Sequence, residues 1–311
     1  ADFCDLSFMC GANFDGATFL GTAKFERTEF YKDVVFMSAK FSDIADFSDA
    51  LFSNEVSFFD TEFCDHVYFD DTQFKGVVSF MGATFSSDAS FHDTTFLSSV
   101  NFVCTTFSDS ANFVEVKFSQ DHLTLFEETR FVGYDRNKKN IIPAKLSDIN
   151  FSSEVIFRQC DLSRVSFLDS NLEKARFYEC SWGNLGLPLF GNEETGTTFQ
   201  YSAERSMLWD EYAITNTVAR YVWGTKANSF LEYYKIANLN RQLKKNFDDK
   251  KDYQLADDFY VGEMEMHTKG LQVEKGGRFW KNFGKLFFLW FYKHISNYNS
   301  KPEQALFCLI C

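Results

Sequence analysis

Three acid or base side chains late in the chain alternate in a way that could suggest a metal site: Glu263, Glu265 and His267. On a helix, residues two apart point to different faces, so these three side chains cannot converge on one ion. We interpret them as solvated. His66 and His92 lie in turns of a repeat and are interpreted as surface residues, not acid–base catalysts. We therefore predict no catalytic residue and no metal ligand at these positions.

Other sequence patterns that carry chemistry are missing. The many Asp residues follow no D-x-D-x-D-G calcium pattern. The sequence also lacks G-x-G-x-x-G, G-x-x-x-x-G-K-S/T, H-E-x-x-H and G-x-S-x-G. Of its 8 Cys, only Cys308 and Cys311 form a C-x-x-C, without a second pair. We interpret the cysteines as reduced, mostly buried thiols of a cytoplasmic protein. The sequence thus predicts a protein that is not an enzyme and has no cofactor.

Negative charge is concentrated in the first part of the chain, which has a net charge of -13 overall. Residues 1–133 contain 22 Asp and Glu against 7 Lys and Arg, a net charge of -15. The other 22 acids and 24 bases give residues 134–311 a net charge of +2. The two parts of the chain are therefore expected to face different surroundings.

Phenylalanine recurs at alternating spacings of five and six residues, and the residue two before each Phe is small or β-branched. On a helix, at about 100° per residue, the apolar positions of this eleven-residue unit would surround the axis. In an extended chain, residues i-2 and i share a face, so the pattern predicts short strands separated by turns. The clearest ladder comprises Phe41, Phe47, Phe52, Phe58, Phe63, Phe69, Phe74 and Phe80.

The segments ADFSDALF, VSFFDTEF and CDLSRVSFLDSNLEKARF resemble the A-(D/N)-(L/F)-x-x pattern of pentapeptide repeat proteins. The resemblance implies a right-handed parallel β-helix with a square cross-section and four pentapeptides per coil. Because every second unit of the first stretch has one extra residue, we expect about 22 residues per coil there and a bulged corner. Coils about 4.8 Å apart would stack equivalent Phe rings into ladders.

The predicted fold class is mainly β: a right-handed parallel quadrilateral β-helix, followed by an α-helical hairpin and a membrane-interfacial segment. Residues 1–133 are predicted to form about six Phe-rich coils, residues 134–143 a basic insertion, and residues 144–190 about two further coils. Residues 191–224 are interpreted as a capping or irregular region, residues 225–268 as the hairpin, and residues 269–311 as a basic and aromatic juxtamembrane segment.

The hairpin is predicted from helical spacing of apolar residues on both sides of the sequence DDKKD. Residues 240–266 resemble a segment that follows the repeats in bacterial membrane-attached pentapeptide repeat proteins, where it precedes transmembrane helices. The candidate hairpin and partner-contact residues are Arg241, Leu243, Phe247, Tyr253, Ala256, Phe259 and Tyr260.

Residues 269–311 mix Lys and Arg with aromatic residues, which suits a membrane interface. The run LFFLWFY, residues 286–292, is too short to cross a bilayer. ALFCLIC, residues 305–311, could open a spanning helix, and the flanking positive charge would keep the repeats on the cytoplasmic side. An ordinary packed helix is the alternative. The candidate membrane-contact residues are Arg278, Trp280, Lys281, Lys285, Trp290, Tyr292 and Lys293.

These features predict a non-enzymatic scaffold or protein-interaction module, either on the cytoplasmic face of a bacterial membrane or otherwise in the cytoplasm. A protein partner of unknown identity and a membrane surface are expected, and homo-oligomerisation is left open. One alternative is an acidic DNA mimic that binds a DNA-processing enzyme such as a topoisomerase. A second is a regulatory domain of a membrane channel or transporter. Direct nucleic-acid binding is not expected of the acidic repeats.

Overall fold

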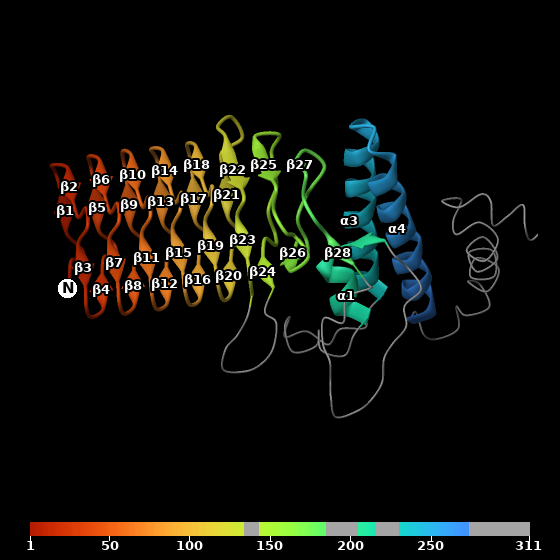
Figure 1. Cartoon of the computed structure of the whole chain (residues 1–311), viewed down its shortest axis with the longest axis horizontal. Helices are drawn as coiled ribbons and strands as arrows, with labels where there is room; N and C mark the ends of the chain where they lie inside the picture. The colour runs from red at the N-terminus through yellow and green to blue at the C-terminus, as the bar shows by residue number, and fades with distance from the viewer. Residues whose placement is uncertain (134–142, 185–204, 216–229, 274–311) are drawn as a thin grey trace, which may run out of the picture. The chain divides into compact units, whose positions relative to one another are not determined.

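The computed structural model describes residues 1–133, 143–184, 205–215 and 230–273 (Figure 1). The chain divides into two compact units, Ala1–Ser181 and Trp182–Cys311, and each is described by itself. The first unit is a parallel β-solenoid of about seven turns. The second has three helices in its described part. The predicted fold class, mainly β with a C-terminal helical part, is confirmed.

Four parallel sheets form the sides of the solenoid, and each is named here by its first strand. The β1 sheet contains β1 (Ser7–Phe8), β5 (Glu29–Phe30), β9 (Leu51–Phe52), β13 (Gln73–Phe74), β17 (Thr95–Phe96) and β21 (Lys117–Phe118). The β2 sheet contains β2 (Ala12–Asn13), β6 (Val34–Val35), β10 (Val56–Ser57), β14 (Val78–Ser79), β18 (Val100–Asn101), β22 (Thr124–Glu127), β25 (Val155–Arg158) and β27 (Arg176–Tyr178). The β3 sheet contains β3 (Thr18–Phe19), β7 (Lys40–Phe41), β11 (Glu62–Phe63), β15 (Thr84–Phe85), β19 (Thr106–Phe107) and β23 (Arg130–Phe131). The β4 sheet contains β4 (Ala23–Lys24), β8 (Ala45–Asp46), β12 (Val67–Tyr68), β16 (Ala89–Ser90), β20 (Ala111–Asn112), β24 (Ala144–Lys145) and β26 (Val165–Ser166).

Strand pairing gives the length of each coil. Ser7 pairs with Glu29, so one coil of the first stretch spans 22 residues, as predicted from the extra residue in every second unit. Near the end of the solenoid, Ile156 pairs with Arg176, which is a coil of 20 residues. The change follows the sequence, because the Phe and Leu spacing there is nearly uniform at five residues.

Two kinds of corner alternate around each coil. In the five-residue segments, the Ala17 N–H donates to the Phe14 carbonyl at 3.0 Å, and Gly16 has a φ of 62°. Positive φ recurs every eleven residues from Asp5 to Glu115, which places a left-handed residue at every second corner. The extra residue therefore belongs to the other, wider corners, such as the one between Phe19 and Phe25.

Phenylalanine rings fill the interior in four ladders. Phe58, for example, is fully buried and stacks on Phe36 and Phe80, with ring centroids 5.0 Å apart on each side. Neighbouring ladders meet edge to face, as Phe58 and Phe69 do at 5.4 Å and 78°. All eight Phe of the predicted ladder are buried and stacked in this way: Phe41, Phe47, Phe52, Phe58, Phe63, Phe69, Phe74 and Phe80.

Buried threonines add hydrogen bonds between coils. Thr61 Oγ1 donates to the carbonyl of Phe36 on the preceding coil at 2.7 Å, and Thr105 Oγ1 donates to that of Phe80 at 2.8 Å. Both threonines are fully buried. A buried hydroxyl group without a hydrogen-bond partner would cost stability. Thr61 and Thr105 avoid this cost, because a carbonyl of the preceding coil accepts their hydrogen bonds.

The second unit contains β28 (Gly183–Asn184) paired antiparallel with β29 (Ser206–Met207), then α1 (Trp209–Thr215), α3 (Phe230–Asp249) and α4 (Tyr253–Val273). α3 and α4 form the predicted hairpin, and the rings of Phe247 and Phe259 stack across it at 5.6 Å. Lys251, with a φ of 63°, closes the turn between them. The region expected to be irregular contains β29 and α1, which are too short to show a period in the sequence.

Candidate protein-binding surface

Between residues 43 and 115, one side of the solenoid carries most of the negative charge. We call the β4 sheet, with the corners on either side of it, the acidic side. Between residues 43 and 115 it has no Lys or Arg and ten carboxylates: Asp43, Asp46, Asp49, Asp65, Asp70, Asp71, Asp88, Asp93, Asp109 and Glu115. A neighbouring strand supplies one cation, because Lys117 Nζ lies 2.6 Å from Asp93 Oδ1. The sequence showed the excess of acids, but only the coil geometry places them on one side.

Tyr68 lies at the centre of the acidic side, on β12. Burial is the first cause that raises the pKa of its phenol, and the negative charges of Asp88, Asp46, Asp70 and Asp65 raise it further. The phenol thus stays neutral among four carboxylates. A cluster of carboxylates beside an aromatic ring can bind the guanidinium of Arg or the ammonium of Lys. The carboxylates form ion pairs with the cation, and the ring makes a cation–π contact.

His66 bridges two carboxylates of the acidic side. Its Nδ1 lies 2.5 Å from Asp65 Oδ1 and its Nε2 lies 3.5 Å from Asp88 Oδ2. The hydrogen bonds from His66 hold the pKa of Asp65 below its usual value. The interpretation of His66 as a surface residue agrees with its 41% side-chain exposure. Its position between two carboxylates was not evident from the sequence.

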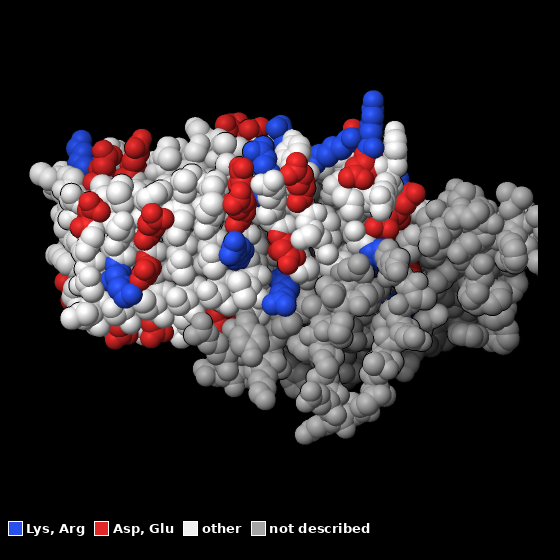
Figure 2. Space-filling view, viewed as in Figure 1, with Lys and Arg blue, Asp and Glu red and all other residues white. Residues whose placement is uncertain are grey.

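The corner between the β2 and β3 sheets lies diagonally opposite the corner between the β4 and β1 sheets, and it has a different chemistry. Met37, Phe59, Met81 and Val103 follow one another there on successive coils, and Met37 and Met81 are exposed. In Figure 2, charged side chains gather near the edges of the side in view, and its middle is mostly uncharged. Acidic side chains line the lower edge, where β4, β8 and β12 lie in Figure 1. The negative charge between residues 43 and 115 is therefore concentrated on the acidic side.

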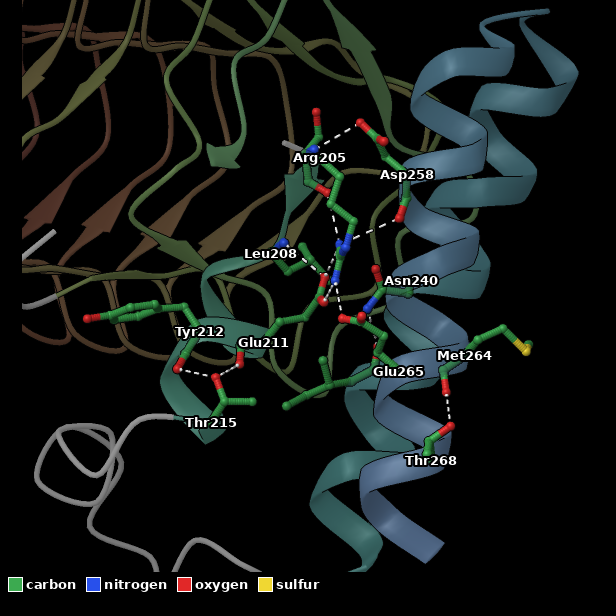
Figure 3. A network of polar contacts seen from close by, with 12 residues as sticks. Arg205, Leu208, Glu211, Tyr212, Thr215, Asn240, Asp258, Met264, Glu265 and Thr268 are labelled. Atoms are coloured by element: carbon green, nitrogen blue, oxygen red, sulfur yellow. Dashed lines mark hydrogen bonds and ion pairs between the residues drawn. The ribbon is translucent and has the colours of Figure 1, made fainter. Parts of the chain in front are cut away.

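A buried ion network holds the helical unit together (Figure 3). Arg205, 6% exposed at its side chain, contacts Glu211 at 2.5 Å and Glu265 at 3.2 Å. It also donates to the Asp258 carbonyl at 3.5 Å, and the Ser206 N–H donates to Asp258 Oδ2 at 2.9 Å. The network joins the segment before α1 to both α1 and α4. The two terminal nitrogens of Arg205 make these contacts, whereas its buried Nε has no hydrogen-bond partner. Because the contacts join three segments of the helical unit, we interpret the network as structural.

The hairpin candidates differ in their accessibility. Arg241 and Tyr253 are exposed, and Tyr260 is half-buried with Lys244 Nζ 5.8 Å from its ring centroid. The other four are buried: Leu243, Phe247, Ala256 and Phe259. Three of the seven therefore have side chains that a partner could reach.

The interpretation of Glu263, Glu265 and His267 as solvated side chains is wrong. Glu265 is 17% exposed at its side chain and contacts the buried Arg205. Glu263 is 6% exposed and accepts a hydrogen bond from Arg241 Nε at 2.8 Å. Arg241 also contacts His267 Nε2 at 3.2 Å. Burial lowers the pKa of His267 below its usual value, and Arg241 lowers it further, whereas Glu263 opposes them. Glu263 and His267 are four residues apart on α4, so they lie on one face of the helix and both contact Arg241 on α3. Glu265, two residues from each, lies on a different face.

The described cysteines are free thiols, but only Cys160 is buried. The expectation of mostly buried thiols is therefore wrong for this part of the chain, because the corners of the solenoid expose Cys10 and Cys104. Within the described ranges, no group of three His, Cys, Asp or Glu side chains is arranged to hold a metal ion.

The membrane-contact candidates, Arg278, Trp280, Lys281, Lys285, Trp290, Tyr292 and Lys293, and the Cys308-x-x-Cys311 pair lie outside the described residues. Among the helices that are described, none has the length and apolar character needed to cross a bilayer.

Comparison with known families agrees with the repeat. Two family models described as pentapeptide repeats match the chain: one of 9 copies over residues 36–80 and 69–117, and one of 8 copies over residues 144–181. No curated protein and no solved structure matches the chain.

Proposed function

Because the chain is a pentapeptide repeat protein, and such proteins are commonly non-enzymatic protein-interaction modules, we propose that it is a scaffold. Its solenoid is a rigid rod, and the acidic side binds a Lys- and Arg-rich segment of a partner protein. Nearest-neighbour stacking of coils makes such a rod stiff along its length.

The concentration of carboxylates on the acidic side between residues 43 and 115 supports this proposal most directly. Asp49, Asp71 and Asp93 occupy equivalent corners of successive coils, each separated by about the 4.8 Å between parallel strands. At that distance salt screens their mutual repulsion only in part, since the Debye length is about 8 Å at physiological ionic strength. A cationic partner relieves this repulsion, whereas a charge needed only for solubility could be spread over all sides.

We also propose that residues 269–311 attach the scaffold to the cytoplasmic face of a bacterial membrane. Support comes from their sequence, in which Lys and Arg alternate with Trp, Tyr and Phe. Basic and aromatic side chains favour anionic headgroups and the bilayer interface. The test is flotation on anionic liposomes with and without this segment at two salt concentrations. Flotation that does not depend on the segment would contradict the proposal.

A photo-crosslinking amino acid introduced in place of Tyr68 tests the protein-binding surface in cells. The same crosslinker in place of Met81, on the opposite corner, is the matched control. We expect a partner with a basic surface to be crosslinked from position 68 and not from position 81. Changing Asp46, Asp70 and Asp88 to Asn should abolish the crosslink, while changing Glu55, Asp60 and Asp121 to amides should preserve it. Equal crosslinking from positions 68 and 81 would contradict the proposed surface.

The acidic side also supports a second candidate function, in which it occupies the basic groove of a DNA-binding enzyme. Both functions require the same carboxylates, but only this one predicts inhibition of an enzyme such as a topoisomerase. A supercoiling assay with purified gyrase distinguishes them: the scaffold predicts no effect, and the mimic predicts inhibition that weakens steeply with salt.

A further inference from the structure

The last two coils of the solenoid place two cysteines side by side. Arg158 pairs with Tyr178 in the β2 sheet, and the Ser181 N–H donates to the Cys160 carbonyl at 3.0 Å. Continuing this register brings Cys160 and Cys180 to equivalent positions on adjacent coils. The strand separation of about 4.8 Å lies inside the range of about 4.4–6.8 Å between Cα atoms in disulfides.

The two thiols point the same way. Cys160 Sγ lies 3.3 Å from the Phe126 carbonyl, and Cys180 Sγ lies 3.4 Å from the Phe157 carbonyl. These are the contacts that Thr61 and Thr105 make with carbonyls of the preceding coil. The structure therefore puts each sulfur in the position of a threonine hydroxyl, in one column along the solenoid.

We propose that Cys160 and Cys180 form a reversible disulfide, which makes the end of the solenoid a site of oxidative modification. The geometry distinguishes this pair from Cys10 and Cys104, the two exposed cysteines on earlier coils. In the column of equivalent corners, the position one coil before Cys160 is Thr129, so the pair has no third thiol beside it. The disulfide would join the ends of the last 20-residue coil.

A small disulfide such as oxidised glutathione serves as the oxidant. The Cys180 thiol, half-buried where Cys160 is buried, loses its proton and attacks one sulfur of the oxidant. This forms a mixed disulfide and releases one small thiol. The deprotonated Cys160 then attacks Cys180 Sγ, which releases the second small thiol. The two cysteine protons end on the two released thiols, and the two electrons of the cysteine pair reduce the oxidant.

The hydrogen bond with Cys180, followed by burial, raises the pKa of Cys160. The Cys160 thiolate that closes the disulfide is therefore scarce at neutral pH, and this second step should quicken by up to about tenfold per pH unit while Cys160 is mostly protonated. Such a pair responds to sustained oxidation and less to brief exposure.

The test uses the full chain, incubated with oxidised glutathione at two pH values, then alkylated, digested and analysed by mass spectrometry. We expect a peptide that links Cys160 to Cys180, lighter by two hydrogen atoms than its two thiol parts and lost after reduction. The linkage should form faster at the higher pH. Peptide mapping separates it from any bond between Cys308 and Cys311.

Two variants sharpen the outcome. Cys104→Ser should leave the linked peptide unchanged, whereas Cys180→Ser should remove it without altering glutathione addition at Cys104. The proposal is overturned if Cys160 and Cys180 stay as thiols, or if Cys180 only retains glutathione, while Cys10 and Cys104 are fully modified in the same sample. These two contrary outcomes are read from the wild-type protein, so they do not depend on how a variant folds.

Discussion

The rings of Phe58 and Phe80 lie 2° from parallel and 5.0 Å apart, although 22 residues separate them. Phe58 has the same relationship with Phe36 on its other side. Each buried ring is therefore stabilised by its two neighbouring coils, and a change at one ring should affect the coils next to it most. This local dependence is the basis of the predictions below.

Phe58 and Phe59 offer a matched pair for testing the ladder. Phe58→Ala should lower the free energy of unfolding by about 3–5 kcal/mol, because it leaves a cavity between two stacked rings. Phe59→Ala should cost much less, since Phe59 is half-buried on the outer corner. Urea denaturation of the two variants measures the difference. Equal losses would show that the interior ladder is not the main source of stability.

Two glycines at the wide corners should respond in opposite ways to a methyl group. A Cβ at Gly76 would lie 2.3 Å from the Asn54 carbonyl oxygen, whereas one at Gly21 would meet no atom within 4 Å. Neither has a positive φ. We expect Gly76→Ala to destabilise the protein by about 1–3 kcal/mol, and Gly21→Ala to be neutral or slightly stabilising. Thermal unfolding of both variants checks this, and a harmless Gly76→Ala would contradict the close spacing of the coils.

Replacement of Arg205 should damage the helical unit. Arg205→Met removes the cation that Glu211 and Glu265 share in a buried site, and the expected loss is about 3–5 kcal/mol. The double variant in which Glu211 is also changed to Gln should recover part of this loss, because one stranded carboxylate is removed. Hydrogen exchange in α1 and α4 reports the effect locally. Greater destabilisation in the double variant would mean that the network is not governed by its charge balance.

The stability of the hairpin should fall in acid because of His267. Its pKa in the folded protein lies below the usual value, mainly through burial, so folding favours the neutral ring. This contribution is complete above the pKa of the unfolded chain and is lost as pH falls through the lower folded pKa. Protonation also ends the hydrogen bond that Nε2 accepts from Arg241. Melting temperatures at about pH 7.5 and about pH 5 should differ less in His267→Gln than in the wild type.

The repeating part of the fold could be predicted because its signal is repeated. A spacing of five and six residues between Phe41, Phe47 and Phe52 excludes a helix and sets the coil length. The hairpin followed from ordinary helical periods in α3 and α4. By contrast, α1 spans only Trp209–Thr215, and a segment of that length carries too few apolar positions to show a period.

The candidate surface was harder to predict than the fold. The number of acids can be counted in the sequence, but a linear count does not tell which corner each residue occupies. Tyr68 and Asp88 meet only because 22-residue coils bring residues about 20 apart into contact. Arg205 lies outside any periodic pattern, so its three acidic neighbours could not be assigned from spacing. The environment of Glu263 and His267 is set by Arg241 on α3, and the spacing of residues within α4 alone does not show which side chains of α3 face them.

The 22-residue coil also bears on how such a chain can change in length. Because Asp46, Tyr68 and Ser90 are successive partners in one sheet, removal of one whole coil would bring the flanking strands back into the same register. The rod would shorten by about 4.8 Å while every remaining ring still met a ring. Gains and losses of single coils are thus tolerable steps in evolution, whereas a deletion of one residue within a strand would turn inward side chains of that strand outward.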